Sequence, residues 1–207
     1  MSLRDSLFAM TYDKQMGRTE EAGVRAMRER LLAGAKGRVI EIGSGTGANL
    51  PWYGPDVESL TMTEPSTPMV RRLERRLSEL GSAGTVLRAP AEDLPFENAT
   101  FDVAVSTLVL CGVDDQPRAL RELRRVLRPG GTLLFLEHVR AEDAKRARQQ
   151  DKMNWLNRIV VRCDCNRPTL DTISQAGFAV TAVEHTALPK TPPFVSPAVI
   201  GSATAPA

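Results

Sequence analysis

The segment VIEIGSGTGANL, residues 39–50, limits the folds open to this chain more than any other stretch. A run rich in β-branched residues, with Val39, Ile40 and Ile42, enters a turn that contains three glycines, Gly43, Gly45 and Gly47. A buried strand followed at once by such a turn is typical of the first unit of an open α/β sheet, where glycines let a ligand approach bare backbone. The turn therefore predicts both a fold class and the position of a ligand site.

The rest of the chain alternates strand and helix patterns. Strands are predicted over 38–42, 60–65, 85–90, 101–110 and 132–139, and two closing strands over 178–188 and 197–205. Helices are predicted over 68–80 and from Asp114 or Asp115 up to the RPGG segment (128–131), which we expect to end that helix. This alternation predicts an α/β fold with a doubly wound, mostly parallel seven-stranded sheet.

Composition excludes several classes of protein. The 27 Lys and Arg against 25 Asp and Glu leave a net charge of +2, which argues neither for nor strongly against nucleic acid. The arginine runs within 71–76 and 121–128 are interrupted by acidic residues, as on solvated helix faces, so no nucleic-acid partner is expected. The longest apolar run, 103–113, is well short of the roughly 20 residues of a membrane span. The 3 cysteines form no C-x-x-C pair, and the N-terminus meets charge too early for a signal peptide, so a cytoplasmic location is expected. No long heptad pattern indicates a coiled-coil partner, and the oligomeric state stays open.

The glycine turn alone fits two kinds of ligand. Gly43, Gly45 and Ala48 satisfy the dinucleotide pattern G-x-G-x-x-G/A. Gly43, Gly45 and Gly47 give a G-x-G-x-G turn preceded by Glu41, which suits S-adenosylmethionine. The glycines do not decide between them.

Three later features help to separate the two ligands. The second predicted strand ends on Glu64, which can accept hydrogen bonds from ribose hydroxyls of NAD or S-adenosylmethionine and would repel the 2′-phosphate of NADP. The segment APAEDLPF (89–96) offers Glu92 and Asp93 to an adenine amino group and Leu94 to its ring. LRPGG (127–131) is not part of the dinucleotide fingerprint.

Together these motifs resemble the class I S-adenosylmethionine-dependent methyltransferases of the type 11 group, most firmly over 38–137. A narrower likeness, carried by YDKQM, GTGAN, STLVLC, LRPGG, LEHV and CNRPTLD, is to the small alkyl-thiol methyltransferases of animals. Those enzymes carry a hydrophobic N-terminal anchor that this sequence does not show. Bacterial phospholipid N-methyltransferases share the pattern of GTGANLPWYGPDV, and menaquinone C-methyltransferases share the core motifs.

The resemblance implies an enzyme that transfers a methyl group from S-adenosylmethionine to a small-molecule acceptor, with a thiol favoured. N-methylation of a phospholipid or amine, and C- or O-methylation of a quinone-like or other small metabolite, are the alternatives. It also implies one methyltransferase domain: a helical cap over 1–36, a cofactor-binding core over 37–139, a substrate-side insertion over 140–176 and closing strands over 177–207.

The resemblance further assigns roles to residues. The turn residues would hold the methionine part of the cofactor, Glu41 its amino group, Glu64 its ribose, and Glu92, Asp93 and Leu94 its adenine. Thr107 and Leu108 would line the sulfonium side, and Tyr12 would close over the cofactor. The full set implied to bind cofactor is Tyr12, Glu41, Gly43, Ser44, Gly45, Gly47, Asn49, Glu64, Pro65, Glu92, Asp93, Leu94, Thr107 and Leu108.

A histidine and three cysteines remain as candidates for chemistry. His138, at the end of the fifth predicted strand, is placed either to act as a base on the acceptor or to order the following loop. Cys163 and Cys165 form a C-x-C pair without a nearby histidine in the sequence, which lacks the usual zinc spacing, so no metal is expected. Cys111 follows an apolar strand and is expected to be a packed core thiol.

Overall fold

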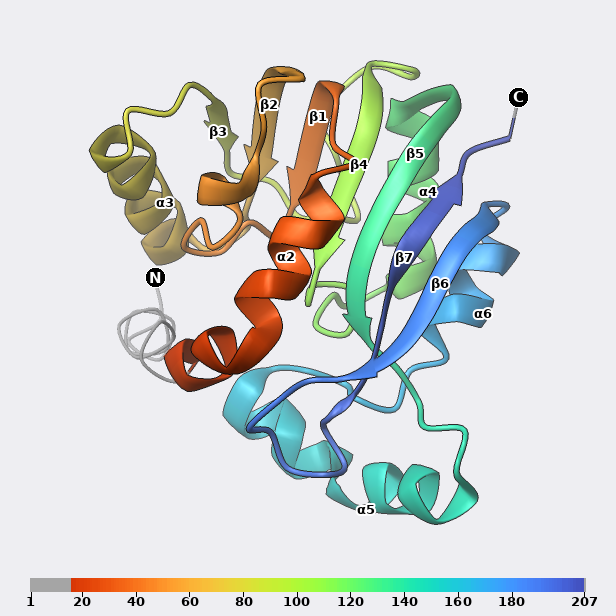
Figure 1. Ribbon diagram of the computed structural model, residues 1–207. Helices are drawn as coiled ribbons and strands as arrows, with labels where there is room; N and C mark the ends of the chain where they lie inside the picture. Colours follow the sequence, from red (N-terminus) through yellow and green to blue (C-terminus); the bar gives the residue numbers. More distant parts are fainter. Residues whose placement is uncertain (1–15, 207) are drawn as a thin grey trace.

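The computed structural model describes residues 16–206, which form a seven-stranded sheet with the order β3-β2-β1-β4-β5-β7-β6 (Figure 1). Strands β1 to β5 pair in parallel, and β7 runs antiparallel between β5 and β6. The predicted doubly wound, mostly parallel sheet is therefore confirmed. The strands are β1 (Gly37–Ile42), β2 (Val57–Thr63), β3 (Thr85–Leu87), β4 (Phe101–Thr107), β5 (Leu127–His138), β6 (Ala179–Ala187) and β7 (Pro197–Thr204).

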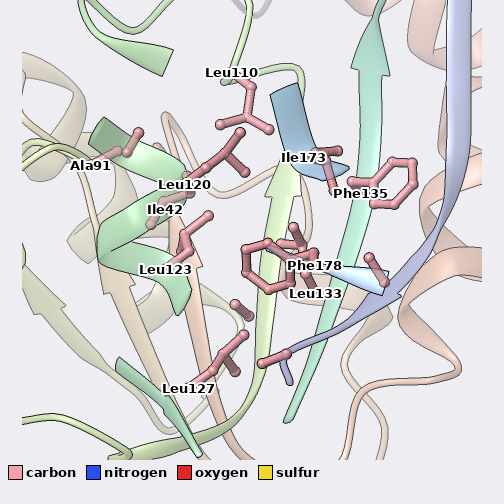
Figure 2. Close-up of a cluster of buried hydrophobic side chains, with 14 of the residues drawn as sticks. Ile42, Ala91, Leu110, Leu120, Leu123, Leu127, Leu133, Phe135, Ile173 and Phe178 are labelled. Atoms are coloured by element: carbon pink, nitrogen blue, oxygen red, sulfur yellow. The ribbon is translucent and has the colours of Figure 1, made fainter. Parts of the chain in front are cut away.

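Helices cover both faces of the sheet because successive side chains of each buried strand point to opposite sides. On one face, Val39 and Val103 pack in a cluster with residues of α2 (Arg25–Leu32) and α3 (Thr67–Glu79). On the other face, Ile42 and Phe135 pack against α4 (Gln116–Val126) and α6 (Thr169–Gln175), as Figure 2 shows. The short π-helix η1 (Glu20–Val24) precedes α2, and the 3-10 helix η2 (Leu50–Trp52) follows the glycine turn.

Several predicted boundaries differ from those in the structure. Helix α4 ends at Val126, just before the RPGG segment as expected, but that segment lies within β5, which begins at Leu127 rather than at residue 132. Phe101 pairs with Leu127 and Val103 with Thr132, so residues 128–131 form a bulge in that strand. Strands β3 and β4 end at Leu87 and Thr107, each three residues earlier than predicted. The second strand ends at Thr63, and Glu64 follows it in the loop.

The segment over 140–176 divides into two parts with different surroundings. Helix α5 (Ala144–Val161) lies beyond the carboxyl ends of the parallel strands (Figure 1). Helix α6 instead packs on the sheet, with Ile173 buried in the core beside α4. Only the first part is therefore placed over the edge where ligands of such sheets bind. No helix in the described range is both long and apolar enough to cross a bilayer.

Candidate active site

A cavity of about 540 Å³ lies at the carboxyl edge of the parallel strands. Its wall is built from the loops that follow four strands, because parallel strands bring their carboxyl ends to one edge of the sheet. Of the residues predicted to bind cofactor, six line it: Gly43, Gly45, Glu64, Pro65, Glu92 and Leu108. Tyr12 lies outside the described residues.

The glycine turn presents bare backbone to this cavity. Gly43, Gly45 and Gly47 have φ of 55°, 56° and 84°, the left-handed region that favours glycine. A Cβ at Gly43 would lie 2.5 Å from a methyl group of Val109, whereas a Cβ at Gly45 would meet no protein atom nearer than 3.9 Å. Gly45 thus borders open space that a side chain would fill, which is the form expected of a cradle for S-adenosylmethionine.

Glu64 ties the end of β2 to the glycine turn. Its Oε2 accepts a hydrogen bond from the backbone N–H of Gly45 at 3.0 Å, and its Oε1 accepts one from Ser66 N–H at 2.9 Å. Burial raises the pKa of this carboxyl above its ordinary value, although both N–H groups favour the charged form. The group both shapes the cavity wall and offers an acceptor to hydroxyl groups inside it.

The two acidic residues after β3, Glu92 and Asp93, have different surroundings in the structure. Glu92 lines the cavity, and its Oε1 accepts a hydrogen bond from Asp114 N–H at 2.8 Å. Asp93 is exposed to solvent, and Leu94 is buried in the core with its N–H donating to Glu122 Oε2 at 2.9 Å. Neither Asp93 nor Leu94 is among the residues that line the cavity.

Glu41, Asn49 and Thr107 meet in a buried polar network rather than in the cavity wall. Arg28 Nη1 donates to Asn49 Oδ1 at 2.9 Å and to Thr107 Oγ1 at 2.8 Å. Asn49 Nδ2 and the Tyr53 hydroxyl donate to the two oxygens of Glu41. Burial raises the pKa of Glu41, and these donors oppose that rise. The network connects α2 and β1 with the end of β4.

Sequence reasoning missed two members of this network. Arg28 is 3% exposed and also pairs with Glu20 at 2.9 Å, yet in the sequence it looks like one of several charges on a solvated helix. Tyr53 lies within the segment GTGANLPWYGPDV, but nothing in that pattern indicated a role for it. Ser44 lies next to the network, its Oγ donating to the Glu41 carbonyl at 3.3 Å, and Gly47 packs near Leu50.

A second cavity, of about 380 Å³, adjoins the first. Both are lined by Leu108, Cys111, Gly112, Val161 and Arg162, which come from the loop after β4 and the end of α5. In the described range, four non-glycine residues have left-handed φ, and three of them line the second cavity: Leu108 (60°), Arg162 (55°) and Lys190 (57°). Such backbone is costly, of order 1–3 kcal/mol for each residue, and gathers at functional sites.

Three residues distant in sequence meet at the wall of the second cavity. His138 Nδ1 lies 3.4 Å from Cys111 Sγ and 3.3 Å from Cys163 Sγ, and all three side chains are buried. The neighbouring Cys163 thiol and burial hold the pKa of Cys111 well above its ordinary value. A histidine therefore lies beside Cys163 in the fold, although none is near it in the sequence. Cys111 is buried, but it also lines both cavities.

Glu137, which sequence reasoning did not single out, anchors the loop that separates the cavities. Its Oε1 accepts hydrogen bonds from Ser106 Oγ at 2.6 Å and from Val109 N–H at 3.0 Å, and the side chain is fully buried. Burial raises the pKa of this carboxyl. A lone acidic residue within the apolar run LLFLEHV was the available signal.

Comparisons with known proteins place this chain in a family. A family model described as a methyltransferase domain matches residues 40–135. The human thiol S-methyltransferase TMT1A is 31% identical over 201 residues, covering 95% of this chain and 82% of that protein. The phosphatidylethanolamine N-methyltransferase of Cereibacter sphaeroides is 27% identical over 173 residues, covering 79% and 84%.

A solved structure shows the same fold. The geranyl diphosphate C-methyltransferase of Streptomyces coelicolor A3(2), in complex with Mg²⁺, geranyl diphosphate and S-adenosyl-L-homocysteine, superposes with a TM-score of 0.68 at 16% identity, covering 87% of this chain and 78% of that one. With the sheet, the glycine turn and the relatives in agreement, the dinucleotide alternative falls away. The chain belongs to the class I S-adenosylmethionine-dependent methyltransferases of the type 11 group.

Proposed function

We propose that this methyltransferase acts on a small-molecule thiol and forms a thioether. The observation that carries the proposal is the second cavity, which shares a wall with the cofactor cavity. Apolar side chains such as Leu156, Val160 and Phe194 supply most of its lining. An apolar alkyl chain fits this lining, and its reacting end would lie toward Leu108 and Cys111, where the cavities meet.

Charge in the second cavity favours a thiol over an amine. No Asp or Glu stands among the described residues that line it, whereas Arg162 and Lys190 do. A protonated amine would lose its hydration there without gaining a carboxylate partner, which is costly. A thiol is neutral or becomes an anion, and both forms are compatible with two nearby cations. The name of the relative TMT1A points to the same class of acceptor.

S-adenosylmethionine supplies a methyl group on a positively charged sulfur, which is a good leaving group. The chain's own residues then have to hold and align the reactants. We assign the ribose hydroxyls to Glu64 beside Pro65, the adenine to the segment from Glu92, and the methionine end to the turn at Gly45. Helix α5 we assign to covering the acceptor, because Val161 and Arg162 at its end line both cavities.

The reducing cytoplasm is the location we propose for this reaction. Cys111, Cys163 and Cys165 are all free thiols in the structure, and reduced thiols persist in that compartment.

The experiment compares three acceptors that differ only in the reacting atom: hexanethiol, hexylamine and hexanol. The protein is incubated with each acceptor and S-adenosylmethionine, and both the demethylated nucleoside and the methylated acceptor are measured by mass spectrometry. We expect methyl hexyl sulfide to form at least about 100-fold faster than the other products, a difference of ~2.7 kcal/mol in barrier. The variant Gly45→Val, which fills the cofactor cradle, serves as the inactive control.

A faster reaction of hexylamine, or of phosphatidylethanolamine vesicles tested in the same assay, would overturn the proposal. The second outcome would favour the activity that the Cereibacter relative's name describes.

A further inference from the structure

The cluster of Cys111, His138 and Cys163 has the composition of a metal site. The three residues come from the loop after β4, the end of β5 and the segment after α5. Their Sγ and Nδ1 atoms all lie within 4.8 Å of one another, and the three residues are 2%, 8% and 6% exposed. We propose that they bind one zinc ion, whose fourth position takes the sulfur of the acceptor thiol.

The distances fit a tetrahedral zinc ion. Bonds of about 2.3 Å to sulfur and about 2.0–2.1 Å to nitrogen place neighbouring ligand atoms about 3.5 Å apart for N and S, and about 3.8 Å apart for two sulfurs. The measured separations from His138 Nδ1 are 3.4 Å to Cys111 Sγ and 3.3 Å to Cys163 Sγ. Both N–S separations lie within about 0.2 Å of the tetrahedral value, and the two sulfur atoms lie no more than 4.8 Å apart, so side-chain adjustments of at most about 1 Å would place these three atoms on one face of the tetrahedron.

Ligand chemistry and charge select the ion. Two thiolates and an imidazole suit Zn²⁺ and other soft or borderline ions, whereas Mg²⁺ and Ca²⁺ require oxygen ligands. Two thiolates balance the two positive charges of zinc, so the loaded site is neutral, as burial demands. Within residues 16–206, no fourth His, Cys, Asp or Glu belongs to the cluster.

The fourth coordination position of the ion is open, as in catalytic rather than structural zinc sites. Structural zinc sites have four protein ligands, whereas catalytic sites have three and leave one position for water or substrate. Cys111, His138 and Cys163 all line the second cavity, and Cys111 also lines the cofactor cavity. The acceptor sulfur on this ion would thus stand at the boundary between the two cavities.

This role rests on the proposed thiol activity. On binding to zinc the acceptor S–H loses its proton to solvent, because a coordinated thiol is deprotonated. A lone pair of the resulting thiolate then forms the new S–CH₃ bond while the bond from the methyl carbon to the sulfonium sulfur breaks, and that sulfur keeps the electron pair. The products are a neutral thioether, a weak ligand that leaves, and S-adenosylhomocysteine. No oxidant or reductant is needed.

The test uses Co²⁺ as a spectroscopic probe for zinc. Chelator-stripped full-length protein is titrated with Co²⁺ under reducing, oxygen-free conditions, and Zn²⁺ is then added to displace it. We expect one equivalent to give the visible bands of a tetrahedral site with thiolate-to-cobalt charge transfer, and hexanethiol to strengthen that charge transfer. We expect Cys163→Ala and His138→Gln to weaken Co²⁺ binding at least 100-fold.

Cys165→Ala is the matched control. Cys165 is also a fully buried thiol, two residues from Cys163, but its Sγ contacts Asn154 Oδ1 at 3.8 Å and it lines neither cavity. We expect its Co²⁺ spectrum to match that of the wild type. Circular dichroism verifies that each variant is folded, and Cys111→Ala repeats the test from another element if one of the others unfolds.

Several results would overturn the proposal. One is the absence of charge transfer in the wild type, and another is an equal spectrum in Cys163→Ala. If the wild type takes up no metal in the titration, and peroxide then removes two titratable thiols, Cys111 and Cys163 form a redox pair instead of a metal site. Failure of the proposed zinc site can be told apart from failure of the proposed thiol methylation. Thiol methylation at full rate in metal-free protein would refute the role of zinc alone. A cobalt spectrum that responds to hexanethiol, without any methylation, would refute the activity alone.

Discussion

Replacing Gly45 and Gly47 separately by alanine distinguishes a ligand cradle from a packing constraint. Both residues have left-handed φ, 56° and 84°, so each alanine pays about 1–2 kcal/mol of backbone strain. A Cβ at position 45 would lie no closer than 3.9 Å to any protein atom. A Cβ at position 47 would lie 2.7 Å from Leu50 Cδ1 and 2.9 Å from Leu73 Cδ1, which adds about 1–3 kcal/mol of overpacking.

The two variants should therefore fail in different ways. For Gly45→Ala we expect a loss of about 1–2 kcal/mol in the free energy of unfolding. Its affinity for S-adenosylhomocysteine should fall at least about tenfold, equivalent to ~1.4 kcal/mol. For Gly47→Ala we expect a loss of about 2–5 kcal/mol in stability, with near-normal affinity in the fraction that is folded.

Urea unfolding and isothermal titration with S-adenosylhomocysteine measure both quantities on the same samples. Wild-type affinity in Gly45→Ala would refute the cradle, because a methyl group would then occupy the cavity at no cost to the ligand. Equal stability of the two variants would refute the packing argument.

Three further substitutions test other parts of the site and fold. Glu64→Gln should weaken S-adenosylhomocysteine binding by about 1.5–3 kcal/mol in titration calorimetry, because an amide cannot accept from both backbone N–H groups that Glu64 now engages; an unchanged Kd would contradict this. Arg28→Ala should lower the free energy of unfolding in urea by about 3–5 kcal/mol, because it breaks a buried ion pair. Arg30→Ala, which removes an exposed ion pair, should lower it by less than ~1 kcal/mol. Similar losses in the two variants would show that the buried network is unimportant. Asp102→Ala should cost about 1.5–3 kcal/mol at pH 7. Desolvation raises the pKa of Asp102, but hydrogen bonds from Arg38 and nearby arginine charge outweigh it and lower the pKa below 3.8. The stability that Asp102 contributes is therefore complete above pH 3.8 and should shrink as the pH falls below it. A stability difference between Asp102→Ala and the wild type that stays constant down to about pH 3 would be the contrary result.

The features predicted well from the sequence are those that local chemistry encodes. The glycine turn needs left-handed backbone within five residues, and Glu64 follows a strand pattern directly, so both could be placed at the carboxyl edge of the sheet. The alternation of strand and helix patterns likewise predicted the sheet. Each signal lies within one short window of sequence.

What could not be predicted depends on contacts between distant segments. Arg28 reaches Thr107 across 79 positions, and His138 reaches Cys111 and Cys163 across 27 and 25. A charge on a helix and an isolated cysteine carry no local sign of such partners. Similarly, helical periodicity in 140–176 could not show that α6 packs on the sheet while α5 lies beyond its edge, because periodicity does not identify the surface that a helix covers.

The insertion of β7 between β5 and β6 has a consequence for how the protein is made. Strand β5 ends at His138, and its antiparallel partner begins only at Pro197. At ~5–20 residues per second, a ribosome takes about 3–12 s to synthesise the roughly 60 residues between them. Throughout that interval the nascent chain carries β5 with one edge unpaired, and such an edge invites pairing with other chains. The edge of β5 is therefore open to pairing with other chains during translation, before the last strand exists.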